Sequence, residues 1–265
     1  MFNQHDQRLI RDENNVFQLV AVSVLGDREE QQDSFGYRLM DNEGFVIVCD
    51  GMGGHEGGSQ ASTVAVQTFL ERYGQDGFGV DRNSGMIATA KVADERVCRL
   101  TNTRGERLKA GSTLVAICIE GRRLLWCAAG DSRAYLLRNG ELKKLTTDHN
   151  YMSVLTEKRD VGLLNQMEFE RESTRGEALI SFLGVGNLSL IDYAKVPLAL
   201  QQNDRIIVMS DGLYKCVTEA EIGRILDNFS NLGEALQALE AKAQRNAKSQ
   251  KIVRDNMTVA LINVK

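Results

Sequence analysis

The chain has 265 residues, enough for one large domain or two small ones, and enough to bury a core without disulfides or structural metal. Its 32 basic and 36 acidic residues give a formal net charge of −4, which excludes a strongly basic surface for nucleic acid or an anionic membrane. The polar first residues lack an apolar signal core, and no run of about 18 apolar residues occurs. We therefore expect a cytoplasmic protein without nucleic-acid or membrane partners.

Cysteine and histidine are too few and too scattered for zinc chemistry. The five cysteines stand singly without a CxxC pair, a pattern typical of reduced, buried thiols. The three histidines are not spaced as ligand pairs. The sequence thus predicts neither disulfides nor a zinc site.

The first third of the chain combines strand and helix patterns. Residues 1–15 have no periodic apolar pattern and are predicted to form a flexible leader. Runs rich in β-branched and aromatic residues are predicted to be strands: 16–24, 35–40 and 44–50. Apolar residues then recur at intervals of three and four, which predicts helices within 61–73 and 87–100.

The remainder returns to strands around one long polar segment. Four further strands are predicted at 113–120, 122–130, 134–138 and 141–145. The last two are joined by Asn139-Gly140, a dipeptide that favours a tight hairpin. Residues 148–180 are polar and longer than an ordinary connection, so we expect a functional excursion there. Later elements are predicted as strands at 190–200 and 205–211, helices starting after Thr218 and Asn231, and a strand at 257–264.

These elements predict an α+β domain. Helices are grouped at two places in the sequence, and there is no strict alternation of strand and helix. This arrangement favours two antiparallel sheets over a parallel one. No repeat or linker divides the chain, so residues 16–265 are predicted to form one domain, with 150–180 as a flap-like excursion.

Four aspartates lie beside the ends of the most apolar strands. Asp50, Asp131 and Asp211 each adjoin a glycine, and Asp255 precedes the closing strand. Each Asp-Gly step alone could be an ordinary turn. A carboxylate at the end of a buried strand is costly unless it is paired or metal-bound, and four together would repel one another. Oxygen ligands without histidine favour Mg²⁺ or Mn²⁺.

Seven segments resemble, in order and spacing, the motifs of the metal-dependent protein phosphatases, the PPM or type 2C family. They are GDREEQQDSFG (26–36), FVIVCDGMGGHEGGSQAS (45–62), AGSTLVAI (110–117), CAAGDSRAYLLRNG (127–140), LTTDH (145–149), IIVMSDGL (206–213) and DNMTVALI (255–262). The DGMGGH form is similar to the bacterial branch. The resemblance implies a four-layer αββα sandwich, with two antiparallel sheets flanked by helix pairs and a metal site at one end.

The resemblance also implies a set of metal ligands. Asp50 matches the ligand that bridges two core metals, and the carbonyl of Gly51 would reach one of them. Asp211 and Asp255 match ligands of the other core metal. Asp131 matches the aspartate that, with Asp211, holds a third and weaker metal in bacterial members.

Two further residues are implied in catalysis together with Asp50. Arg28 matches the arginine that grips the substrate phosphate, and its planar fork suits two phosphate oxygens. The alternative is that it is a surface arginine in an acidic cluster. Asp33 matches the carboxylate that hydrogen-bonds a metal-bound water.

The implied activity is hydrolysis of phosphoserine and phosphothreonine in proteins. A hydroxide bridging two Mn²⁺ or Mg²⁺ ions would attack phosphorus directly, without a phosphoenzyme. The implied partners are phosphorylated proteins, with a cognate Hanks-type kinase or its targets supplying them. We expect the chain to act as a monomer.

Some residues depart from the family pattern and keep a second interpretation open. Gln32 stands where a carboxylate is frequent, and Met52 stands where eukaryotic members have a histidine proposed as general acid. The segment 181–184 also lacks a usual arginine. The alternative function is therefore a phosphoprotein-binding module without turnover. A nucleotide-binding enzyme and a serine hydrolase are disfavoured because their motifs are missing, and a cysteine hydrolase because no cysteine has a setting that would lower its pKa.

Overall fold

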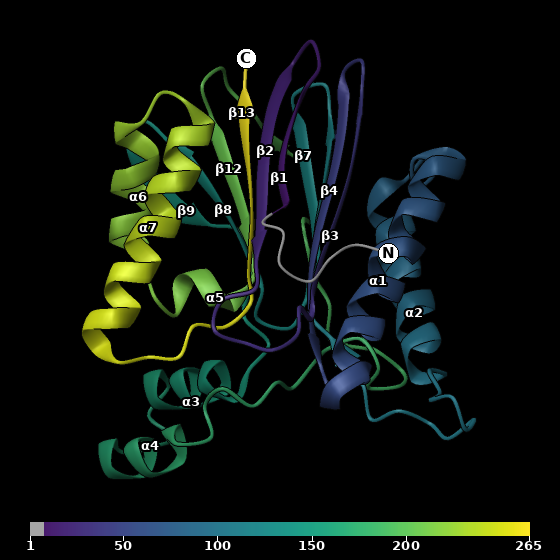
Figure 1. Ribbon diagram of the computed structural model, residues 1–265, viewed down its shortest axis with the longest axis vertical. Coiled ribbons are helices and arrows are strands. Elements are labelled where there is room, and N and C mark those ends of the chain that lie inside the picture. The colour runs from purple at the N-terminus through teal and green to yellow at the C-terminus, as the bar shows by residue number, and fades with distance from the viewer. Residues whose placement is uncertain (1–7) are drawn as a thin grey trace.

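Two antiparallel sheets lie face to face, and each carries a pair of helices on its outer side (Figure 1). The computed structural model describes residues 8–265, apart from the side chains of Arg8, His55 and Glu56. The predicted α+β class and the four-layer arrangement are confirmed. Among the described helices, none combines the length and the apolar character needed to cross a membrane.

The six-stranded sheet has the order β1-β2-β13-β12-β8-β9. Its strands are β1 Arg8–Glu13, β2 Phe17–Val24, β13 Met257–Val264, β12 Arg205–Met209, β8 Arg133–Arg138 and β9 Glu141–Lys144. Helices α6 (Glu219–Asn228) and α7 (Leu232–Gln250) cover its outer face. The predicted start of α6 is confirmed, because Thr218 and Glu221 form a reciprocal capping box.

The seven-stranded sheet has the order β10-β7-β6-β4-β3, with β11 paired to β7 and β5 paired to β4. Its strands are β10 Asp192–Tyr193, β7 Arg123–Ala129, β6 Leu114–Glu120, β4 Glu43–Met52, β3 Asp33–Met40, β11 Leu198–Ala199 and β5 Gly111–Ser112. Helices α1 (Gly54–Asp76) and α2 (Arg82–Cys98) cover its outer face.

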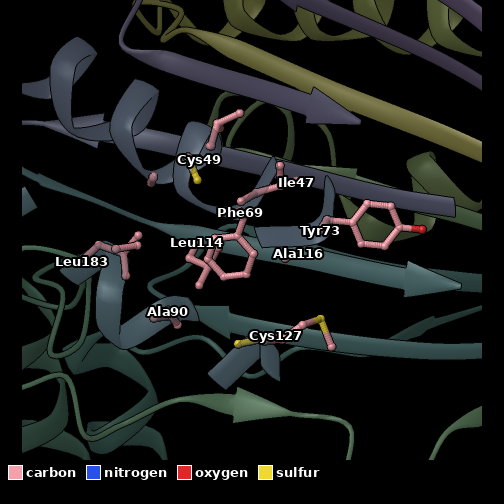
Figure 2. Close-up of a cluster of buried hydrophobic side chains, with 14 of the residues drawn as sticks. Ile47, Cys49, Phe69, Tyr73, Ala90, Leu114, Ala116, Cys127 and Leu183 are labelled. Atoms are coloured by element: carbon pink, nitrogen blue, oxygen red, sulfur yellow. The ribbon is translucent and has the colours of Figure 1, made fainter. Parts of the chain in front are cut away.

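The alternation of side chains along β4 explains how the site is placed. Ile47 and Cys49 point into the core beneath α1 and α2, as Figure 2 shows, whereas Val46 and Val48 point into the core between the sheets. Side chains of a strand alternate with a period of two, so Asp50 continues the inner series. The strand thus delivers a carboxylate between the two sheets where the apolar core ends.

The prediction of a flexible leader at 1–15 is wrong for its second half. Residues 8–13 form β1, which pairs with β2 along its whole length from Arg8↔Ser23 to Glu13↔Gln18. Backbone pairing at a sheet edge does not require an apolar side-chain pattern, which is why the polar sequence concealed the strand. Residues 1–7 of the predicted leader lie outside the described residues.

Two other segments differ from their sequence patterns. The predicted strand at 190–200 is divided into two short strands, β10 and β11, of two residues each. Pro197 lies between them and has no backbone N–H to donate to a neighbouring strand. The polar segment 148–180 contains two helices that the periodicity did not predict, α3 (Tyr151–Asp160) and α4 (Gln166–Ser173). Both lie beyond the end of the sandwich, below the six-stranded sheet in Figure 1.

Candidate functional site

A cleft of about 720 Å³ opens at the end of the sandwich where β4 and β12 finish. Six of the seven predicted site residues line it: Arg28, Asp50, Gly51, Asp131, Asp211 and Asp255. The seventh, Asp33, lies opposite Asp50 in the register of β3 and β4 and is buried. The structure therefore brings together residues that are up to 227 positions apart in the chain.

Asp33 and Asp50 form the buried part of the site. Oδ2 of Asp33 accepts a hydrogen bond from the Ser210 hydroxyl at 2.7 Å. Burial raises the pKa of Asp33 to about 7 against the bonds it accepts. The pKa of Asp50 is raised well above its usual range, first by burial and then by the charges of Asp33 and Asp211. These shifts mark carboxylates that crowd one another away from water.

The backbone of Asp50 is fixed by a residue that the sequence analysis did not single out. Its N–H donates to the Thr113 hydroxyl at 2.8 Å, and the N–H of Thr113 donates to its carbonyl oxygen at 2.8 Å. The Thr113 hydroxyl also lies 2.7 Å from that of Ser132, beside Asp131. A Gly-Ser-Thr run before an apolar strand was the available signal, but it is too common to predict a contact over 63 positions.

Gly51 is at a position where no side chain fits. A Cβ atom there would lie 2.0 Å from the carbonyl oxygen of Gly58 and 2.7 Å from that of Gln32. The N–H of Gly51 donates to the same Gln32 oxygen at 3.1 Å. The glycine therefore lets helix α1 and the Gln32 loop close directly over the Asp50 strand.

Asp131 and Asp211 form the side of the cleft that belongs to the six-stranded sheet. Asp211 begins the short helix α5 (Asp211–Tyr214), and only Ser210 separates this helix from β12. Its Oδ2 atom lies 2.7 Å from Nζ of Lys215, whereas its Oδ1 atom is buried without a hydrogen-bond partner. Burial and the charge of Asp211 raise the pKa of Asp131 to about 6.

Arg28 and Asp255 form the outer rim, and Asn256 organises it. An Arg28 nitrogen lies 2.7 Å from Oδ2 of Asp255, with the arginine side chain 56% exposed. The Asn256 amide donates to the carbonyl oxygens of Leu25 and Glu30 and accepts from the N–H of Gln32. One side chain thus holds both ends of the loop that carries Arg28. The sequence analysis missed this role because nothing local to Asn256 indicates these partners.

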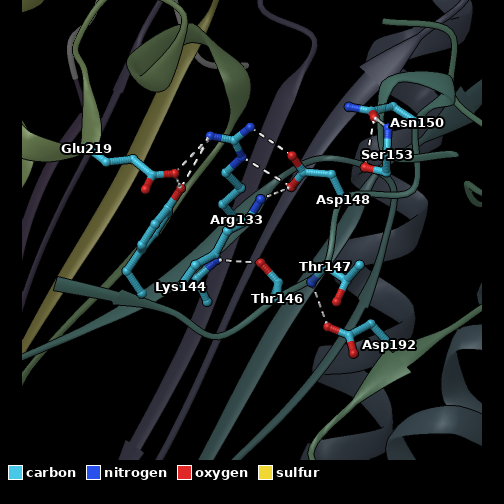
Figure 3. Close-up of polar contacts among 11 residues, drawn as sticks. Arg133, Lys144, Thr146, Thr147, Asp148, Asn150, Ser153, Asp192 and Glu219 are labelled. Atoms are coloured by element: carbon cyan, nitrogen blue, oxygen red, sulfur yellow. Dashed lines mark hydrogen bonds and ion pairs between the residues drawn. The ribbon is translucent and has the colours of Figure 1, made fainter. Parts of the chain in front are cut away.

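A second polar cluster lies behind the cleft, around Arg133 (Figure 3). Asp148 accepts two hydrogen bonds from the Arg133 guanidinium, at 3.1 and 2.7 Å, and one from Lys144 at 2.5 Å. The guanidinium also lies 3.6 Å from the ring centroid of Tyr214, and one of its nitrogens lies 3.7 Å from a carboxylate oxygen of Glu219. This cluster ties β8 and β9 to α5 and α6.

The donor set of the cleft fits a hard divalent cation. Among the described residues, no three His, Cys, Asp or Glu side chains are gathered into a finished metal cage. Instead, one oxygen of Asp255 forms an ion pair with Arg28, and one oxygen of Asp211 forms an ion pair with Lys215. Two buried carboxylate oxygens, Oδ1 of Asp33 and of Asp211, have no partner and are therefore ready acceptors. An all-oxygen set with unsatisfied carboxylates suits Mg²⁺ or Mn²⁺.

Comparisons with known proteins agree with this geometry. A family model described as protein phosphatase 2C matches residues 23–254. The serine/threonine phosphatase stp of Listeria monocytogenes is 28% identical over 239 residues, covering 89% of this chain and 90% of that protein.

Solved structures show the same fold. The S. agalactiae serine/threonine phosphatase is 24% identical with a TM-score of 0.80, covering 94% of this chain and 100% of that one. The catalytic domain of the serine threonine protein phosphatase PstP, in complex with two manganese ions, is 25% identical with a TM-score of 0.74. That match covers 94% of this chain and 98% of the PstP chain.

Proposed function

The chain belongs to the protein phosphatase 2C family, and from this premise we propose that it is a metal-dependent serine/threonine phosphatase acting on phosphorylated proteins. The observation that carries the proposal is the cleft, which Arg28 and the four strand-end aspartates of the sequence analysis line together, although they come from distant parts of the chain. A phosphate monoester needs both an anion-binding group and a cation site beside it, and the cleft supplies the residues for both.

We propose the metal ligands that the family resemblance implies. Asp50 and the carbonyl oxygen of Gly51 would hold one core ion, and Asp50, Asp211 and Asp255 would hold the other. Such a pair of ions, when bound, supplies a water nucleophile at neutral pH and neutralises charge on the phosphoryl group. PstP, which is described with two manganese ions, supports Mn²⁺ as a suitable metal.

Arg28 and Asp33 have separate roles in this proposal. Arg28 lies on the rim with an exposed, permanently charged fork, so it can bind two oxygens of an incoming phosphate. Asp33 is locked in place through Ser210 and keeps one free carboxylate oxygen, which can accept a hydrogen bond from a water in the site. Met52, which lines the cleft, has a thioether side chain and cannot protonate the leaving group.

We also propose the broader setting of the reaction. The bacterial relatives that are named serine/threonine phosphatases support a phosphoprotein substrate. We propose that a cognate Hanks-type kinase or its targets supply this substrate. Glu177 and Leu179 line the cleft, which supports a role for the flap at 150–180 in admitting that substrate. We propose that residues 16–265 act as one domain, as a monomer and in the cytoplasm.

The test compares wild-type protein with Asp50→Asn in Mn²⁺ buffer, using p-nitrophenyl phosphate and a phosphothreonine peptide. Replacing the carboxylate between the two proposed ions should lower kcat on the order of 10³-fold. EDTA should abolish wild-type activity reversibly while the circular dichroism spectrum stays unchanged, because the core is large enough to stand alone.

The rival function, a binding module without turnover, is favoured by Gln32, whose side-chain amide donates to the Gly54 carbonyl at 3.4 Å where relatives often carry a carboxylate. Wild-type protein that is no faster than Asp50→Asn, yet still binds the phosphopeptide in a calorimeter, would establish the rival and contradict the enzyme.

A further inference from the structure

Lys215 lines the cleft beside Asp131 and Asp211, and the sequence analysis did not identify it as a site residue. It follows α5 by one residue and is four positions after Asp211, so the two side chains share one face of the helix. Its Nζ atom lies 2.7 Å from Oδ2 of Asp211 and 3.4 Å from a carboxylate oxygen of Glu177. A cation is therefore anchored between the metal-site aspartate and the flap.

The two oxygens of Asp211 are used differently. Oδ1 is buried without a partner and is free for a core ion, whereas Oδ2 binds the Lys215 ammonium. Asp211 is nearly buried, with 11% of its side chain exposed, so there is little room for another cation at Oδ2. The aspartate is thus divided between one oxygen for a metal and one oxygen for a lysine.

Asp131 lies within the field of the same ammonium. Asp131 lines the same cleft as Asp211 and Lys215. The Lys215 ammonium, held by Asp211 and Glu177, places a positive charge in that cleft. Lys215 therefore neutralises the pair of carboxylates that was predicted to hold the third and weaker metal.

We propose that the Lys215 ammonium takes the place of this third cation, so that the wild-type protein binds two divalent ions and Asp131 serves as a partner of the lysine. The inference rests on the proposed function, because the core pair must still form through Asp50, Asp255 and Oδ1 of Asp211. Physically, a tethered ammonium neutralises Asp131 and Asp211 without loss of translational freedom, and it repels a divalent ion from the same space.

The decisive measurement is the number of Mn²⁺ ions bound per chain, by calorimetric titration of EDTA-treated and dialysed protein. Wild type should bind two. Lys215→Met keeps the length of the side chain but removes its charge, so it should bind a third, weaker ion. Lys215→Arg keeps a positive charge and should remain at two. Lys91→Met, at an exposed position on α2, is the matched control and should also remain at two.

The third ion of Lys215→Met must depend on Asp131. The double variant Lys215→Met with Asp131→Ala should therefore return to two ions, and thermal melting should show that every variant is folded. Three ions in wild type, or two in a folded Lys215→Met, would overturn the inference while leaving the core pair intact. Fewer than two in wild type would overturn the proposed function and this inference with it.

Discussion

Two arginine–aspartate pairs near the cleft have the same contact distance and opposite surroundings. In the rim pair, Arg28 and Asp255 approach to 2.7 Å, with side chains 56% and 31% exposed. In the pair behind the cleft, Arg133 and Asp148 also approach to 2.7 Å, but with side chains only 17% and 10% exposed. The contact distance alone therefore does not distinguish a functional pair from a structural one.

The surroundings make the distinction. Arg28 donates one hydrogen bond to Asp255 and faces solvent in the cleft, so the pair can exchange partners at low cost. Arg133 binds Asp148 through two hydrogen bonds and lies against the Tyr214 ring. Breaking a buried pair leaves an uncompensated charge, which is why such pairs behave as fixed parts of the fold.

The largest expected effect is on stability, from Arg133→Met. Removing one partner of a buried ion pair costs about 3–5 kcal/mol, and Lys144, which still pairs with Asp148, favours the lower figure of about 3 kcal/mol. In a domain of this size we expect the melting temperature to fall by about 6–12 °C. Calorimetry of the Mn²⁺-loaded protein measures this melting temperature. Arg28→Met is the matched control and should melt at the wild-type temperature. Equal melting temperatures for the two variants would contradict the claim that only the buried pair stabilises the fold.

Arg28→Lys should show the converse, a loss of activity without a loss of stability. Lysine keeps the charge but loses the planar fork, so we expect kcat/KM for a phosphothreonine peptide to fall about 10–100-fold. Steady-state kinetics measures the change, and thermal melting should be unaltered because the side chain is exposed. A variant as active as wild type would show that Arg28 is the surface arginine of the alternative interpretation.

The sequence was sufficient for those features whose signal is local. Val46 and Val48 alternate with Ile47 and Cys49, and this continuous apolar run indicated a strand buried on both faces with an aspartate at its end. The sheets, the helix pairs and the residues that meet at the cleft could be predicted from such runs and from the resemblance. The roles assigned to those residues stay predictions.

Other features depend on partners that are distant in sequence. Strand β1 exists because β2 offers its edge, and no property of residues 8–13 alone requires a strand. Asn256 and Lys215 are ordinary polar residues until folding brings the Gln32 loop and Asp211 beside them. The helices of the flap are short and polar, so their caps at Asn150 and Asn165 were the only local signal.

The smallest expected effect concerns a third pair, which positions the rim. The Arg254 guanidinium donates twice to Oδ1 of Asp27, at 3.1 and 2.6 Å, while the N–H of Arg254 donates to Oδ2. The N–H of Asp27 in turn donates to the Arg254 carbonyl. This clamp joins the two segments that carry Arg28 and Asp255, so a partly exposed pair of little energetic value can still control where the Arg28 guanidinium lies.

Arg254→Met should accordingly lower kcat/KM for the phosphopeptide by about three- to tenfold and leave the melting temperature nearly unchanged, since exposed pairs contribute about 0–1 kcal/mol. Arg99→Met is the matched control, because Arg99 forms an exposed pair with Glu95 on α2, away from the cleft. The loss should appear in kcat/KM for the phosphopeptide at low salt and shrink at high salt, where the wild-type clamp is itself screened. If Arg254→Met and Arg99→Met had the same kcat/KM for the phosphopeptide, the position of the Arg254–Asp27 pair beside the cleft would have no effect on activity.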